Sequence, residues 1–295
     1  PLTEETHHLI NSASVEKMKK GEYLAQCFAM FVPFTVDNPF ETCMDMIARY
    51  YKEIEQNKDL IAPAFTYEDI ENNIKNNKLT ALLTIEEGGI LEGDMSRLER
   101  LYEEGVRLMT LLWNYENCSG YPNSRDRNVM EKGLKPFGIE VVQRMNELGM
   151  IVDVSHMSDA GFYDVLACMK NPFVASHSNA RSICPCVRNL SDDMIRKLAE
   201  RGGVTGLNYC ADFLTQLPAG VHNPGTIEAI VTHAKYITNL GGMECVGLGS
   251  DFDGIDTHEE LPGADCMERL WEALKKGGFK ERELDLIFSE NVLRV

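Results

Sequence analysis

The stretch IVDVSHMSDAGFYDVLACMKNPFVASHS, residues 151–178, carries the pattern that decides the fold. It contains two short apolar runs that each end on a Ser-His pair, and the segment 159–169 between them has the length and spacing of one helix. A strand, a helix and a second strand in succession are typical of a parallel sheet covered by helices. The carboxyl ends of parallel strands meet at one face of a barrel, so we expect His156 and His177 at that face.

The same alternation extends along the chain in both directions. We predict further strands at 24–32, 79–86, 106–113, 204–209 and 245–254, and further helices at 40–56, 94–105, 138–149, 190–203, 226–240, 265–276 and 281–294. No GxGxxG or Walker A motif follows a strand, so an α/β (β/α)8 TIM barrel fits better than an open doubly wound sheet, with one strand unaccounted for. No linker divides the sequence, and the polar stretch 114–135 suits an active-site loop, so we expect a single domain over 1–295.

Composition excludes several classes of function. The net charge of −17 argues against nucleic acid as the main partner, and no run of about 18 apolar residues predicts a membrane span. The nine cysteines are scattered without CxxC pairs, which favours free thiols in a reducing compartment and a cytoplasmic location. The chain starts at Pro1 rather than Met, so an upstream segment, including a signal, is left open.

Five of the predicted strands end on groups capable of chemistry: Glu86, His156, His177, Asn208 and Asp251. Carboxylate and neutral imidazole together are a common ligand set for Zn²⁺, so the pattern predicts a metal site at the strand ends.

Each of these residues also has a structural alternative. Glu86 or its neighbour Glu87 could cap the next helix, and Asp251 with Asp253 could form an Asx-type turn. Arg188 could pair with the acidic first turn of the helix that follows it. Trp113 is expected to pack against loop residues, and we assign no chemistry to the remaining histidines, His7, His8, His222, His233 and His258.

Five segments together resemble a known family. They are LLTIEEGG, GVRLMTLLWN, GLKPFGIEVVQRMNELGMIVDVSHMS, VASHSNARSICPCVRNLSDDMIRKLAERGG and VGLGSDFDG, in this order along the chain. The sequence resembles the membrane (renal) dipeptidase family of zinc metallopeptidases, within the amidohydrolase-like barrels, and is most similar to bacterial members.

This resemblance implies two zinc ions per subunit on a (β/α)8 barrel that hydrolyses dipeptides, including those with a D-residue at the C-terminus, by a metal-activated hydroxide. It makes Glu86 the carboxylate that bridges the metals, and His156 and His177 the histidines of the second metal site. Arg188 matches the arginine that grips the substrate carboxylate, and Asp251 the acidic residue that handles the proton of the attacking water and the leaving amine. Family members often pair, so a homodimer is expected as well.

The sequence departs from the family pattern in two places. A His-x-Asp motif should end a first strand before residue 15, but residues 1–14 contain none, and THHLIN has the wrong spacing. We therefore expect the first strand upstream of Pro1; alternatively the strand is absent, and the barrel is open and metal-poor. In addition, Trp113 stands where mammalian members have a histidine that polarises the scissile carbonyl, which we interpret as a subfamily feature.

Two rival functions follow from these departures. One is a related metal-dependent amidohydrolase that acts on a non-peptide amide, because fold and metal site do not fix the substrate. The other is a catalytically silent barrel, if the His-x-Asp site is truly absent.

Overall fold

The computed structural model describes residues 12–295 except 34 and 219. The chain forms two compact units, Leu24–Asn171 and a second that joins Pro172–Val295 to the N-terminal segment up to Tyr23. His7 and His8 lie outside the described residues.

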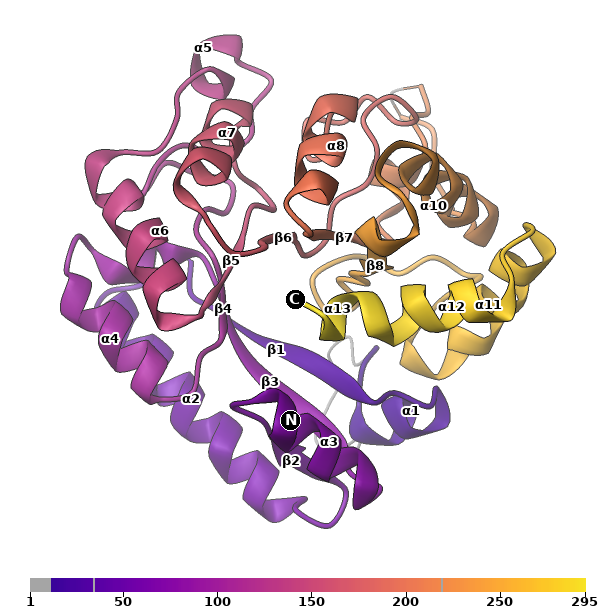
Figure 1. Ribbon diagram of the computed structural model, residues 1–295, viewed down its shortest axis with the longest axis horizontal. Coiled ribbons are helices and arrows are strands. Elements are labelled where there is room, and N and C mark those ends of the chain that lie inside the picture. The colour runs from indigo at the N-terminus through magenta and orange to yellow at the C-terminus, as the bar shows by residue number, and fades with distance from the viewer. Residues whose placement is uncertain (1–11, 34, 219) are drawn as a thin grey trace. The chain divides into compact units, whose positions relative to one another are not determined.

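The first unit is built on a parallel sheet centred on β3 (Leu79–Glu86). β1 (Ala25–Phe31) runs along one edge of β3 (Figure 1), while β2 (Ile61–Pro63) and β4 (Leu108–Thr110) pair with the beginning and the end of β3. β5 (Ile151–Asp153) pairs with β4. β3 is buried at nearly every position, as expected for a central parallel strand with both faces covered.

Helices follow the strands of this unit, and local sequence signals set their ends. α3 begins at a capping box in which Thr66 and Asp69 bond to each other's backbone N–H, and α6 ends at Gly149 with a positive φ of 73°. The helices are α2 (Pro39–Gln56), α3 (Tyr67–Lys75), α4 (Met95–Glu103), α5 (Arg127–Met130), α6 (Pro136–Leu148) and α7 (Asp159–Cys168), with a 3₁₀ turn at Gly88–Leu91.

The second unit contains the parallel strands β6 (Val174–Ala175), β7 (Val204–Leu207) and β8 (Val246–Leu248), in that order. Its helices are α1 (Val15–Lys20), α8 (Asp192–Glu200), α9 (Ala211–Leu214), α10 (Ile227–Gly241), α11 (Met267–Lys276), α12 (Glu281–Asp285) and α13 (Asn291–Leu293), with 3₁₀ turns at Met243–Cys245 and Ala264–Cys266 and a π-helical turn at Leu286–Glu290.

The α/β class with parallel strands is confirmed, and every predicted strand is present, although most are shorter than the apolar run that predicted them. The prediction missed β2, because three residues that end on a proline cannot show a strand pattern. The complete (β/α)8 barrel remains a prediction, and so does the organisation of residues 1–295 as a single domain. Among the described residues, none of the helices combines the length and apolar character needed to cross a membrane.

Candidate active site

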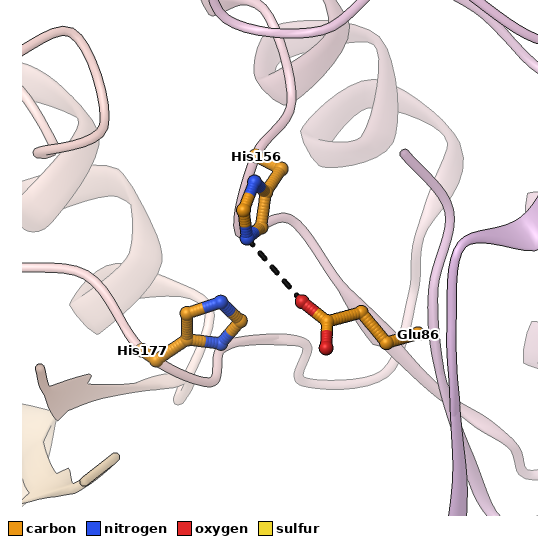
Figure 2. A group of neighbouring side chains, drawn as sticks. All are labelled: Glu86, His156 and His177. Carbon is orange, nitrogen blue, oxygen red and sulfur yellow. Dashed lines mark ion pairs between the residues drawn. The ribbon is translucent and has the colours of Figure 1, made fainter. Parts of the chain in front are cut away.

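Strand register aligns polar side chains at the carboxyl end of the first sheet. Glu86 of β3 is paired with Thr110 of β4, and Thr110 with Asp153 of β5, so the three residues occupy one level across neighbouring strands. His156 comes three residues later and points toward Glu86, with its Nε2 3.3 Å from Glu86 Oε1 (Figure 2). The predicted meeting of Glu86 and His156 is therefore found within this unit.

The imidazole of His156 is held in one orientation. Its Nδ1 lies 2.9 Å from Oδ1 of Asn114, an amide oxygen that accepts the Nδ1 proton. In the neutral imidazole, Nε2 then carries a lone pair, and it faces a carboxylate oxygen of Glu86 that also carries lone pairs. Two such atoms stay close only with a proton or a cation between them, so this pair of donors fits a metal ion.

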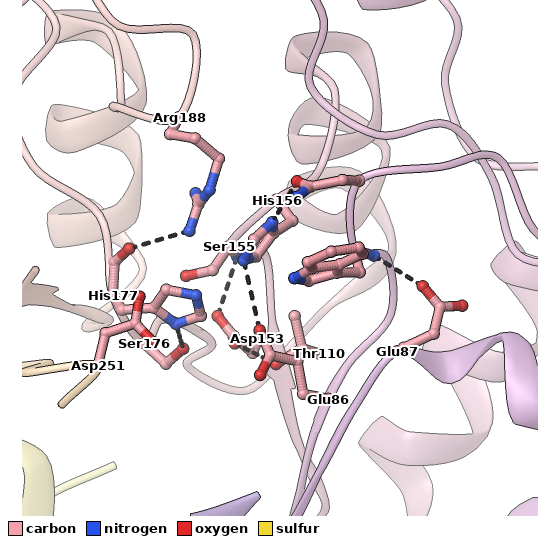
Figure 3. A network of polar contacts seen from close by, with 12 residues as sticks. Glu86, Glu87, Thr110, Asp153, Ser155, His156, Ser176, His177, Arg188 and Asp251 are labelled. Atoms are coloured by element: carbon pink, nitrogen blue, oxygen red, sulfur yellow. Dashed lines mark hydrogen bonds and ion pairs between the residues drawn. The ribbon is translucent and has the colours of Figure 1, made fainter. Parts of the chain in front are cut away.

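Asp153 completes the polar layer at the level of Glu86 and Thr110 (Figure 3). Its carboxylate is fully buried and accepts hydrogen bonds from Thr110 Oγ1 at 2.5 Å and from the backbone N–H of Ser155 at 2.9 Å. The sequence pattern alone gave Asp153 no role, although an acidic residue inside the apolar run IVDV is a signal that could have identified it.

Glu87 takes the structural role that was left open for one of the two adjacent glutamates. It is nearly fully buried, and its carboxylate accepts hydrogen bonds from the backbone N–H groups of Gly89 and Trp113 and from the Asn117 amide. Burial raises the pKa of Glu87, and the three hydrogen bonds oppose that rise. Glu87 thus stabilises the start of the 3₁₀ turn, while Glu86 faces His156.

The indole of Trp113 lies beside this pair rather than only against its own loop. Its ring centroid is 4.9 Å from that of Phe31, at the end of β1, and 6.1 Å from that of His156. Tyr115 packs edge-on against it at 5.7 Å.

In the second unit, His177 and Arg188 lie together beyond the end of β6. The Nδ1 of His177 is 2.6 Å from the hydroxyl of Ser176, and its carbonyl accepts a hydrogen bond from Arg188 Nη2 at 3.3 Å. The Arg188 guanidinium is buried and stacks over Phe213, with 5.4 Å between its Cζ and the ring centroid. These contacts hold a cationic group in one place.

Asp251 follows β8 and adopts a left-handed backbone conformation with φ 68°. Its Oδ2 accepts a hydrogen bond of 2.9 Å from the side-chain amide of Asn208, the residue after β7. Asp253 has a different partner, because its Oδ1 accepts the backbone N–H of Ser12, and burial raises its pKa. The two aspartates of SDFDG therefore have separate roles.

The remaining described histidines lie elsewhere. Both ring nitrogens of His233 are bonded to backbone, at Ala180 and Leu214, and burial lowers its pKa. His222 is exposed, and His258 is buried in the loop after β8.

A family model described as "Membrane dipeptidase (Peptidase family M19)" matches residues 3–295. An uncharacterised protein in the pqqA 5' region of Klebsiella pneumoniae is 36% identical over 234 residues, which cover 77% of this chain and 84% of that protein. An uncharacterised dipeptidase of Schizosaccharomyces pombe, C965.12, is 30% identical over 264 residues, 84% of this chain and 62% of that protein.

The same fold occurs in a solved structure from Rhodobacter sphaeroides, a metallopeptidase liganded with a phosphinate mimic of the dipeptide L-Ala-D-Ala. It matches with a TM-score of 0.87 at 21% identity and covers 99% of this chain and 90% of that one.

Proposed function

Since the chain belongs to the membrane dipeptidase family and is by that membership a metallo-dipeptidase, we propose that it hydrolyses dipeptides with a free C-terminal carboxylate at a zinc centre. The observation that carries this proposal is the 3.3 Å approach of His156 Nε2 to Glu86 Oε1, with the imidazole turned so that its other nitrogen, Nδ1, lies 2.9 Å from Asn114 Oδ1.

We propose Glu86, His156 and His177 as metal ligands, with Glu86 as the bridge between two zinc ions per subunit. Each of them offers one ligand atom, a carboxylate oxygen or an imidazole nitrogen. This is a normal donor set for zinc. When bound, zinc supplies a Lewis acid that acidifies water and polarises the scissile carbonyl.

The other proposed roles belong to Arg188 and Asp251. Arg188 would bind the C-terminal carboxylate of the substrate, since a guanidinium matches a carboxylate with two parallel hydrogen bonds. Because the Arg188 cation is buried and would bind a free C-terminal carboxylate, it would limit the substrates to short peptides. Asp251 would take the proton of the attacking water and pass it to the departing amine.

Acceptance of a D-residue at the C-terminal position is also proposed. It is supported by the related Rhodobacter sphaeroides structure, whose ligand mimics L-Ala-D-Ala. We further propose that the chain forms a closed (β/α)8 barrel, acts as one domain and pairs into a homodimer. We also propose that the protein works in a reducing compartment, which suits its nine free cysteines.

The test combines metal analysis with a substrate comparison. We expect about two zinc ions per chain in protein expressed from the whole gene. We also expect turnover of L-Ala-D-Ala but little turnover of the same dipeptide with an amidated C-terminus, because the amide removes the charge that Arg188 would bind. Zinc-free, inactive protein would support a silent barrel, and hydrolysis of carboxylate-free amides in preference to dipeptides would support a different amidohydrolase.

A further inference from the structure

We propose that Asn208 is a positioning residue that orients the carboxylate of Asp251 for proton transfer; this rests on the role proposed for Asp251 above. Asn208 is the first residue after β7 and is fully buried. β7 and β8 are paired through Leu207 and Leu248, so Asn208 and Asp251 both come from the carboxyl ends of neighbouring strands.

Hydrogen bonds fix which side of the Asn208 amide faces Asp251. Oδ1 accepts the backbone N–H of Cys210 at 2.7 Å, while Nδ2 lies 2.9 Å from Asp251 Oδ2 and 3.4 Å from the carbonyl oxygen of His177. A reversed amide would set its NH₂ against the Cys210 N–H and its oxygen against the carboxylate. Both contacts would be repulsive, so Asn208 is a donor to Asp251.

The backbone of Asn208 is held as firmly as its side chain. Its N–H donates to Asn179 Oδ1 at 3.1 Å, and its carbonyl accepts from Asn179 Nδ2 at 2.9 Å. Asn179 is also fully buried. A donor with both ends fixed in the interior restrains the carboxylate oxygen that it binds.

A glycine stands on the other side of the carboxylate. A Cβ at Gly254 would lie 2.3 Å from Oδ1 of Asp251, so the missing side chain leaves room at that oxygen. With Oδ2 bound by Asn208, we assign proton transfer to Oδ1. The strained φ of 68° at Asp251 is consistent with a backbone that the surrounding contacts hold in place for function.

The test uses Asn208→Asp, which keeps the shape of the side chain and the acceptor for Cys210 but replaces the donor with an oxygen. We expect kcat for L-Ala-D-Ala to fall about 10- to 100-fold, with KM changed less than about two-fold and zinc content unchanged. Gly254→Ala should lower kcat in the same way by crowding Oδ1, and it keeps the proposal testable if Asn208→Asp does not fold.

Asn291→Asp is the matched control. Asn291 is a buried asparagine of the same unit whose Nδ2 donates to the backbone carbonyls of Met243 and Val246, before and at the first residue of β8. The same chemical change there should lower the melting temperature and leave kcat of the folded protein unchanged.

A double variant separates this inference from the proposed function. If Asn208 acts through Asp251, then adding Asn208→Asp to Asp251→Asn should cause no further loss of kcat. If the two substitutions instead lower kcat independently, so that their effects multiply, the positioning role is overturned while the proposed function stands. An Asn208→Asp enzyme whose kcat lies within about two-fold of that of the parent would overturn the positioning role in the same way. An Asp251→Asn enzyme with full turnover would remove the proton-transfer role of Asp251 on which this inference rests, whereas a parent protein that turns over no dipeptide would remove the proposed function itself.

Discussion

At the scale of single residues, two of the residues with a proposed chemical role have a strained backbone. His156 and Asp251 are non-glycine residues that both have a φ of 68°, in the left-handed region that L-residues seldom occupy. Each follows a strand end by three residues. Such strain persists where surrounding contacts enforce it, and it is common at functional sites.

Asp251→Asn tests the proton-transfer role. The amide keeps the size of the side chain but cannot accept a proton, so we expect zinc content to be retained and kcat to fall about 10²- to 10⁴-fold. The measurement is steady-state hydrolysis of L-Ala-D-Ala together with elemental analysis of zinc.

Asp253→Asn is the control for that variant, because it makes the same change two residues away. The carboxylate of Asp253 accepts the backbone N–H of Ser12, a bond that an amide oxygen can also accept. We expect turnover close to that of the parent enzyme. Equal losses in the two variants would argue that the loop, rather than Asp251, is responsible.

At the scale of elements, the sequence predicted positions better than lengths. The run 106–113 was predicted as one strand, but β4 covers only Leu108–Thr110, because the apolar run continues into a buried loop at Leu111 and Leu112. The single helix predicted at 281–294 is divided by a π-helical turn at Leu286–Glu290, for which we have no physical account. An apolar run in the sequence does not show at which residue the chain stops pairing with the sheet.

The polar strand ends were predictable because parallel strands share one direction. Glu86 and His156 were identified in this way, and the register of β3, β4 and β5 explains why they meet. Tertiary partners were not predictable: Asn114 comes from a loop, and the donor role of Asn208 depends on hydrogen bonds made by Cys210.

Gly206→Ala tests how closely β6 and β7 must approach. A Cβ at Gly206 would lie 2.0 Å from the carbonyl oxygen of Ser176, which directly precedes His177. The strands must separate to admit it, so we expect a loss of about 1–3 kcal/mol in unfolding free energy and weaker zinc binding. Chemical denaturation and a competitive zinc titration measure the two effects.

Gly93→Ala is the comparison for Gly206→Ala. Gly93 has a φ of 80°, and a Cβ added there would meet no heavy atom of the described residues within 4 Å, so alanine adds backbone strain without a clash. We expect a small loss of stability and unchanged zinc affinity. Unchanged zinc affinity in Gly206→Ala as well would show that β6 tolerates displacement.

At the scale of the whole molecule, buried histidines link stability to pH. Burial lowers the pKa of His233 and His258 below the usual 6.5, although Glu260 partly opposes this at His258. In the unfolded chain both would take up a proton near pH 6.5, whereas the folded chain resists protonation. Their contribution to stability is therefore complete above about pH 6.5 and is lost as pH falls from there toward the folded pKa, by at most about 1.4 kcal/mol per pH unit for each histidine.

His258→Leu tests this linkage without removing a hydrogen bond, since neither ring nitrogen of His258 has a hydrogen-bond partner within residues 12–295 as described, and only 4% of the residue is exposed. We expect the melting temperature near pH 7.5 to be equal or higher and its drop on acidification to about pH 5.5 to be smaller than in the parent protein. Calorimetry at constant zinc and salt concentration measures both. His222→Leu, at an exposed histidine of the same unit, should leave the drop unchanged. An equal drop in the His258→Leu protein would mean that this side chain does not govern acid stability, and that the sensitivity comes from other groups such as His233.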